Sequence, residues 1–180
     1  MQEDIASILI DRQQIQARVA AMAQDIAAVY GEQEFVLMPL LTGAIIFVAD
    51  LVRHMPQRMK IQVMAVSSYP GKATTHQGAK LLYPSAFQVA GKHVLIIDDI
   101  LDSGQTLQYV SRLLTEAQAA SVRSCVLLRK KIATEQHFTA DFIGFDIPDE
   151  FVVGYGLDYN DYYRNLPDVA VLHRHLLSGD

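Results

Sequence analysis

The sequence predicts an α/β fold in which helices flank a mostly parallel central sheet. The chain has 180 residues and 51% hydrophobic content, which is enough to bury the core of one compact domain. Short apolar runs alternate with helical patterns through its middle, the order that a parallel sheet requires. Charged residues make up 19%, and no repeat or low-complexity stretch stands out. We therefore expect a single domain over residues 1–180.

The first part of the chain predicts a helix followed by one strand–helix unit. Residues 5–30 place apolar side chains at intervals of three and four, the pattern of an amphipathic helix that provides packing surface. Residues 35–40 form a continuous apolar run, which is typical of a buried strand. Thr42 and Gly43 then predict a tight turn, and residues 44–54 predict a second helix.

The rest of the chain predicts further strands around a long loop. Residues 61–66 are rich in branched side chains and predict a strand. Residues 67–80 lose apolar periodicity and gather Ser, Thr, Gly, Pro and Lys, so we expect a long mobile loop there. Such a loop is either an active-site lid or a flexible hairpin connection, and the residues alone leave both open. The remaining expected strands cover residues 94–97, 122–128, 142–145 and 151–153.

Charge and cysteine content limit the partners and the compartment. The formal net charge is −5 and no Lys/Arg cluster has the density of a nucleic-acid patch, so we expect no nucleic-acid partner. Cys125 is the only cysteine and lies in an apolar run, which predicts a buried thiol and no intrachain disulfide. The acidic opening does not match a secretory signal, and the longest apolar stretch, residues 35–49, is shorter than the roughly 20 residues of a membrane-spanning helix. We expect a cytoplasmic protein without a membrane partner.

Chemistry concentrates in residues 94–107, where an apolar strand runs into three acids, a small-residue turn and the start of a helix. Consecutive backbone N–H groups after the strand, kept open by Gly104, predict a concave anion site at a helix N-terminus. The hydroxyl groups of Ser103 and Thr106 add donors to it. The residues of this anion site are Asp102, Ser103, Gly104, Gln105 and Thr106.

Asp98 and Asp99 precede the anion site and need a different partner. Carboxylates repel phosphate, but they accept hydrogen bonds from sugar hydroxyls or bind Mg²⁺. The acids and the anion site together suit a ribose 5-phosphate lying across the strand end. The alternative is a plain turn that caps a helix, with the acids in solvent. The segment lacks Gly-x-x-x-x-Gly-Lys and Gly-x-Gly-x-x-Gly, which argues against nucleotide triphosphate hydrolysis and hydride transfer.

Residues 94–107 resemble the phosphoribosyl-diphosphate-binding motif of the type I phosphoribosyltransferases. Residues 141–159 and 163–167 resemble the purine-binding end of the hypoxanthine (hypoxanthine-guanine) phosphoribosyltransferases, and the whole resemblance extends over roughly residues 10–172. It implies the type I phosphoribosyltransferase fold, with a small base-binding hood in the segment of residues 128–167 and a mobile lid over residues 67–80.

The same resemblance implies how the diphosphate side of the site is built. Asp102 is the acid/base that handles the N7 proton of the purine, and the anion site that it opens holds the 5-phosphate. Asp98, where relatives commonly have Glu, and Asp99 take the ribose hydroxyls. Thr42 and Gly43 align with a short turn that contacts pyrophosphate. Many relatives have a basic residue at Thr42, so in this chain the contact rests on backbone N–H groups.

On the purine side, the resemblance implies that Phe151 stacks on the base and that the backbone of Val152 reads the base edge. Lys130 donates to the 6-oxo group, and Asp158 completes the purine-binding set. Arg164 helps to hold pyrophosphate.

The implied cofactor is Mg²⁺, which accepts phosphate oxygens, water and one carboxylate. Asp158 coordinates the ion as it bridges the diphosphate, and Asp98 and Asp99 are further candidate ligands. Ser68 and Tyr69 sit on the lid.

The implied reaction is purine salvage: 5-phosphoribosyl 1-diphosphate and a 6-oxopurine base, hypoxanthine and/or guanine, give IMP or GMP and pyrophosphate. Two alternatives stay open. A xanthine-guanine phosphoribosyltransferase shares the diphosphate loop but reads the base differently. A nucleotide-sensing RNA-binding regulator can use the same fold, although the acidic net charge argues against it. Apolar content and the amphipathic first helix favour a homodimer or homotetramer.

Overall fold

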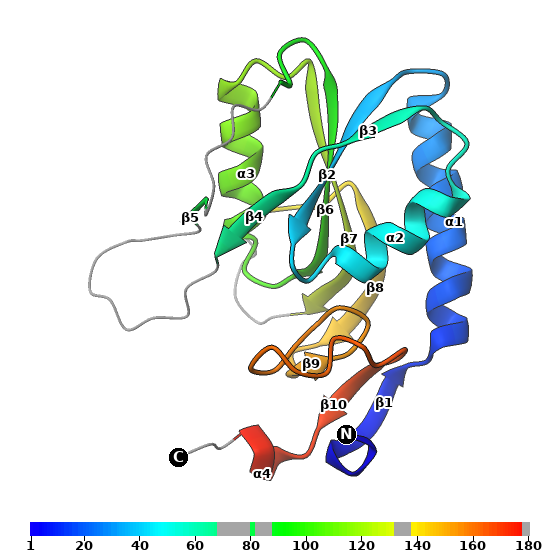
Figure 1. Ribbon diagram of the computed structural model, residues 1–180, viewed down its shortest axis with the longest axis vertical. Coiled ribbons are helices and arrows are strands. Elements are labelled where there is room, and N and C mark those ends of the chain that lie inside the picture. The colour runs from blue at the N-terminus through cyan, green and yellow to red at the C-terminus, as the bar shows by residue number, and fades with distance from the viewer. Residues whose placement is uncertain (68–79, 82–87, 132–137, 178–180) are drawn as a thin grey trace.

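A computed structural model describes residues 1–67, 80–81, 88–131 and 138–177 of the chain. Figure 1 shows a central sheet with α3 on one side and α1 and α2 on the other, and a smaller sheet at the bottom of the view, near both chain termini. The predicted lid residues Ser68 and Tyr69 lie outside the described residues.

The central sheet confirms the predicted α/β class. Its strand order is β5-β4-β2-β6-β7-β8, and β3 also pairs with β2. The described pairs are parallel apart from the antiparallel pair of β4 and β5. Parallel neighbours end at the same edge, so the carboxyl ends of β2, β6 and β7 come together. The strands are β2 (Phe35–Leu41), β3 (Met59–Ile61), β4 (Met64–Ser67), β5 (Lys80–Leu81), β6 (His93–Leu101), β7 (Ser121–Lys131) and β8 (Phe142–Pro148).

Strand β6 is apolar from Val94 to Ile97 because both of its faces are covered there. Leu95 and Ile97 pack with α1 (Arg12–Tyr30) and α2 (Ile45–Leu51), which a short 3₁₀ turn (Val52–His54) extends. Val94 and Ile96 point the other way and pack with α3 (Gln105–Glu116). The alternation follows from the two-residue period of a strand. Cys125 of β7 is fully buried, as predicted, and burial raises the pKa of its thiol.

The predicted helix over residues 5–30 is wrong at its beginning. Ile5–Ile10 forms strand β1, and the helix begins only at Arg12. Asp11 caps it, with its Oδ1 accepting from the Gln13 and Gln14 N–H groups at 2.8 and 2.9 Å, and the Gln14 side chain accepts in return from Asp11 N at 3.0 Å. The spacing of apolar residues before the cap suited a helix, but pairing with a distant strand decides the conformation of β1.

The predicted strand over residues 61–66 is split in two. Strand β3 pairs with the first half of β2, and β4 pairs with its end at Leu40 and Leu41. Gln62 lies between the two strands and still donates its N–H to Leu37 O at 3.0 Å. Both short strands therefore follow the same edge of β2, with a break that the run of branched residues did not indicate.

The smaller sheet lies at one end of the molecule, near both chain termini (Figure 1). Its order is β1-β10-β9, all antiparallel, with β9 at Val152–Val153 and β10 at Val169–Leu172. We call this sheet, together with the loop of residues 154–168, the hood. Strand β10 was not predicted from the sequence. Two short helical segments, Gln2–Asp4 and α4 (Arg174–Leu177), flank the hood strands. None of the helices in the described part of the chain has the length and apolarity needed to cross a membrane.

Candidate active site

The two neighbouring acids lie within strand β6 rather than beyond its end. Asp98 Oδ1 accepts the N–H of Asp99 at 3.1 Å, and Asp99 Oδ1 accepts the N–H of Ile100 at 3.0 Å. Burial and the adjacent Asp99 raise the pKa of Asp98 well above its ordinary value, and burial also raises the pKa of Asp99. Two adjacent, partly buried carboxyl groups are costly to ionise together, so this part of the strand favours a partner that donates hydrogen bonds or carries positive charge.

The predicted anion site follows at the N-terminal end of α3, where the helix dipole favours negative charge. Gly104 occupies the N-cap position with φ of 83°, a left-handed conformation that suits glycine. A Cβ there would also lie 2.7 Å from Phe138 Cβ. The Gln105 N–H reaches Ser103 Oγ at 3.5 Å, and the first bond of the helix runs from Gln108 N to Gly104 O at 2.9 Å. Asp102 is exposed at the mouth of this loop.

The Thr42–Gly43 turn packs directly against the acids. It joins β2 to α2, and the Leu41–Thr42 peptide bond is cis. A Cβ at Gly43 would overlap the Asp99 carboxylate, so glycine is needed for this close approach. The Thr42 side chain is exposed. The turn predicted to contact pyrophosphate and the acid predicted to contact ribose are thus neighbours.

Lys130 connects the two predicted halves of the site. It lies near the end of β7, in the same edge of the sheet as the acids, and only 14% of its side chain is exposed. Its Nζ is 3.4 Å from Asp102 Oδ2 and 3.3 Å from Asp149 Oδ1. The predicted base-reading lysine therefore lies beside the predicted acid/base. Asp149 was not singled out from the sequence, because only the fold brings it to this lysine.

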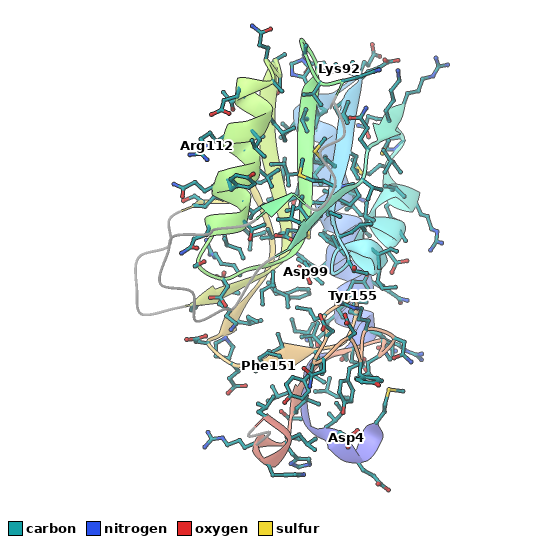
Figure 2. The ribbon with its side chains drawn as sticks, turned by 60° about the vertical axis from the view of Figure 1, so that its left-hand side comes forward. Asp4, Lys92, Asp99, Arg112, Phe151 and Tyr155 are labelled. Atoms are coloured by element: carbon teal, nitrogen blue, oxygen red, sulfur yellow. The ribbon has the colours of Figure 1, made fainter. Side chains whose placement is uncertain are left out.

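Phe151 and Val152 begin the hood side of the site. Val152 is buried at the start of β9, whereas Phe151 keeps 44% of its surface exposed. The Phe151 and Tyr159 rings form a T-shaped contact, with centroids 5.6 Å apart and planes at 83°. Figure 2 shows Asp99 at the end of the sheet that faces the hood, with Phe151 and Tyr155 on the hood side. An exposed aromatic face held by a second aromatic ring can stack on a flat base.

Arg164 and Asp158 pair with each other inside the hood loop. Arg164 Nη2 is 2.8 Å from Asp158 Oδ1 and 3.0 Å from Asp161 Oδ1, and Nη1 donates to Gly156 O at 2.8 Å. The second oxygen of Asp158 accepts the Asp161 N–H at 2.9 Å. Gly156 in turn lies so close to the Thr42–Gly43 turn that a Cβ there would overlap Gly43 O. The residues predicted to hold the diphosphate therefore come from two distant segments that touch.

The candidate metal ligands do not form one cluster. Across the described residues, no group of three or more His, Cys, Asp or Glu side chains is placed to hold a metal ion by itself. Asp98 and Asp99 are neighbours, whereas Asp158 is bound to Arg164. A cation at this site would need oxygen atoms from a substrate, which is how Mg²⁺ is commonly held beside phosphates.

Two further residues tie the hood to the core. Tyr155, in the hood loop, donates its hydroxyl proton to Asp50 Oδ2 of α2 at 2.7 Å. Both lie in segments that resemble the family, but 105 residues separate them, so no local pattern in the sequence indicates the contact.

Comparison with known proteins agrees with this geometry. The family model described as "Phosphoribosyl transferase domain" matches residues 6–160. The hypoxanthine-guanine phosphoribosyltransferase of Mycobacterium tuberculosis (strain ATCC 25618 / H37Rv) is 42% identical over 176 residues, which cover 94% of this chain and 87% of that protein.

Solved structures give the same result. A hypoxanthine phosphoribosyltransferase from Staphylococcus aureus superposes with a TM-score of 0.91 at 33% identity, covering 99% of this chain and 97% of that one. A hypoxanthine-guanine phosphoribosyltransferase from Bacillus anthracis gives a TM-score of 0.87 at 36% identity, covering 94% and 99%. The resemblance and the expected type I fold are confirmed. The chain belongs to the phosphoribosyl transferase domain family and, within it, to the hypoxanthine-guanine phosphoribosyltransferases.

Proposed function

We propose that this protein transfers the 5-phosphoribosyl group of 5-phosphoribosyl 1-diphosphate to hypoxanthine and/or guanine, giving IMP or GMP and pyrophosphate. The observation that carries the proposal is the 3.4 Å distance between Lys130 Nζ and Asp102 Oδ2. The Lys130 ammonium suits a 6-oxo substituent, and the Asp102 carboxylate beside it lies at the start of the anion-binding loop. A sugar phosphate and an oxopurine bound at these two places would share one reaction centre.

In this proposal the base lies between Phe151 and the sheet edge. The partly exposed Phe151 ring stacks on the purine, the Val152 backbone meets the base edge, and the Lys130 ammonium donates to the 6-oxo oxygen. An ammonium group has three donors and no acceptor, so it favours an oxo group over the amino group of adenine. Asp102 accepts the N7 proton as the bond to C1 of the ribose forms.

The sugar phosphate lies along the end of β6. The anion site from Asp102 to Thr106 holds the 5-phosphate with backbone N–H groups and hydroxyls. Asp98 and Asp99 accept hydrogen bonds from the ribose hydroxyls, because carboxylate oxygens are acceptors and repel phosphate.

Pyrophosphate departs toward Gly43 and Arg164. As it leaves C1, positive charge develops on the sugar and negative charge on the leaving group. The backbone N–H groups at Thr42 and Gly43 and the Arg164 guanidinium stabilise the leaving group. Arg164 is paired with Asp158 at 2.8 Å, so the leaving group would compete with this ion pair for the guanidinium.

We also propose that Mg²⁺ is the cofactor. Adjacent carboxyl groups with raised pKa values fit a divalent cation, because its charge offsets their mutual repulsion. Asp98, Asp99 and Asp158 would hold the ion together with diphosphate oxygens. Bound there, Mg²⁺ would supply charge neutralisation of the departing diphosphate.

The test is nucleotide formation from hypoxanthine, guanine, xanthine and adenine in competition, with 5-phosphoribosyl 1-diphosphate and Mg²⁺. Hypoxanthine and guanine should be converted far faster than xanthine or adenine. Dominant use of xanthine would favour the xanthine-guanine alternative. No nucleotide from any base, together with salt-dependent RNA binding, would instead favour the regulatory alternative and overturn the proposal.

We further propose a cytoplasmic homodimer or homotetramer. The supporting surface is on α2, where Ile45 and Ile46 are 44% and 37% exposed side by side. A second copy of the chain would remove this apolar surface from water. The single buried Cys125 suits a reducing compartment. Size-exclusion chromatography with light scattering tests the assembly, and a monomer at micromolar concentration would contradict it.

A further inference from the structure

Tyr155 occupies an unusual position in the hood loop. Its φ is 50°, and its neighbours Gly154 and Gly156 have φ values of 94° and 103°. Three consecutive residues thus have positive φ, which is unfavourable for a tyrosine and needs support from other contacts. The Tyr155 side chain is 6% exposed, so the support comes from the interior.

That support is a hydrogen bond from the hood loop to helix α2. The Tyr155 hydroxyl donates to Asp50 Oδ2 at 2.7 Å, and Asp50 Oδ1 is 3.0 Å from Arg53 Nη1. Burial, followed by the bond to Asp50, raises the pKa of Tyr155 above its ordinary value, so the phenol stays a donor at neutral pH. A hydrogen bond to a charged acceptor is among the stronger kinds.

This bond closes a ring of contacts around the pyrophosphate site. Asp50 lies on α2, the helix that follows the Gly43 turn. Tyr155 precedes Gly156, which abuts Gly43 O and forms two hydrogen bonds with Arg164, one from its N–H at 3.0 Å and one to its carbonyl at 2.8 Å. Two contacts therefore join the segment from Gly43 to Asp50 with the hood loop, one at Gly43 and one at Asp50.

We infer that Tyr155 and Asp50 are positioning residues that hold the Gly43 turn at a fixed distance from Arg164 and thereby set the affinity for the diphosphate. We call the pair the hood clamp. The inference rests on the proposed function, because it assigns pyrophosphate to the site that the clamp encloses. It goes beyond that function because it names the contact that fixes the distance between the Gly43 turn and Arg164.

The site's geometry predicts a selective effect. The clamp borders Gly43 and Arg164 but contacts none of Lys130, Phe151 or Asp102 in the described hydrogen bonds and ion pairs. Loosening it should weaken binding of the diphosphate while base binding and the chemical step change little. A purely structural role would instead lower the stability of the fold, lower kcat and raise the KM for donor and base alike.

The experiment compares three clamp variants with a matched control. Tyr155→Phe removes only the hydroxyl, Asp50→Ala removes the acceptor, and Asp50→Asn keeps an acceptor oxygen. Tyr30→Phe is the control, because Tyr30 is 3% exposed and its hydroxyl reaches Val94 O at 3.4 Å, away from the site. Steady-state kinetics give KM for donor and base, and calorimetry with Mg²⁺ and pyrophosphate gives its Kd.

Tyr155→Phe and Asp50→Ala should each raise the KM for the phosphoribosyl donor and the Kd of pyrophosphate about tenfold, the loss of one charge-assisted hydrogen bond. The kcat and the KM for hypoxanthine should stay within about twofold, and Asp50→Asn should restore most of the affinity. The double variant Tyr155→Phe/Asp50→Ala should be no weaker than either single variant, because the two residues act as one unit.

Unchanged pyrophosphate affinity in folded Tyr155→Phe would overturn the clamp, as would equal losses for donor and base or a similar effect in Tyr30→Phe. The proposed function fails separately, if wild-type protein forms no nucleotide from any base. In that case the pyrophosphate calorimetry still compares the variants, since it does not depend on turnover.

Discussion

The two halves of the active site are built in different ways. The sheet half is one continuous segment, in which β6, the anion loop and α3 follow each other within residues 93–116. The hood half is assembled from three separated strands and is joined to the core by side chains such as Tyr155. The sheet half is therefore fixed by local sequence and a large buried core. The hood half depends on pairing of distant strands, on apolar residues such as Val152 and Val169 that join the core, and on long-range polar contacts.

This difference predicts which residues determine the stability of the fold and which determine ligand recognition. Buried apolar residues from both faces of the central sheet surround the first half. Phe151, directly before β9, and Tyr162 of the hood loop have 44% and 72% of their surfaces exposed. We expect changes in the sheet half to act on folding or on catalysis, and changes at these exposed aromatic residues to act on ligand binding with little effect on folding.

The largest expected effect compares two phenylalanines. Phe47 is fully buried between α2 and the sheet, so Phe47→Ala should lower the free energy of unfolding by about 3–5 kcal/mol. Phe151→Ala should change it by no more than about 0.5 kcal/mol but raise the KM for hypoxanthine roughly tenfold through lost stacking. Urea denaturation and steady-state kinetics measure the two quantities. Similar losses of stability in both variants would break the comparison.

Asp102→Asn tests catalysis in the sheet half. The amide cannot take up the N7 proton, so kcat should fall by about 10²-fold or more while the affinity for the phosphoribosyl donor changes little. Asp25→Asn on α1 is the control, because it removes an exposed carboxylate 3.7 Å from Arg18 without touching the site. Full turnover of Asp102→Asn would remove Asp102 from the mechanism.

Lys130→Met tests the residue that lies between the two halves. It keeps the length of the side chain but removes the ammonium that lies between Asp102 and Asp149. The KM for hypoxanthine should rise roughly tenfold or more, as expected for a lost charged hydrogen bond, and discrimination against adenine should decrease. Lys131→Met, in a side chain that is 68% exposed, should leave both quantities unchanged. An unaltered base preference in Lys130→Met would contradict the proposed role.

The smallest expected effect concerns pH. The raised pKa of Asp98 means that ionisation of this carboxyl lowers folded-state stability. The penalty is absent below the unfolded pKa of about 3.9 and complete above the raised folded pKa. Asp98→Asn should therefore raise the Tm at pH 7 by roughly 2–4 °C, and the gain should disappear toward pH 3.

Asp146→Asn provides the opposite case for calorimetry over the same pH range. The Arg129 hydrogen bond at 2.7 Å lowers the pKa of Asp146, so its stabilising effect is present above the unfolded pKa and is lost as the pH falls through the lowered value. This variant should lose Tm at pH 7 and not in acid. An equal Tm change for Asp98→Asn at pH 7 and pH 3 would show that burial of a charge is not its cause.

The same contrast explains what could be predicted from the sequence. The segment around Asp98 and Gly104 was recognisable because strand, acids, turn and helix start are adjacent, and each has a local signature. Local patterns failed where partners are distant. Residues 5–10 carry helix-like spacing but pair with β10, and β10 itself is too short to stand out. Lys130 and Arg164 were identified by resemblance, whereas their partners Asp149 and Gly156 required the fold.

The order of the hood strands has a consequence for biosynthesis. Strand β9, which starts the proposed purine side, pairs only with β10 in the described sheet, and β10 pairs with β1. A chain still on the ribosome can form β2, β6, α3 and β7 well before β10 emerges. The proposed sugar-phosphate half can therefore form first, whereas the hood needs residues 169–172 to pair with residues 5–10.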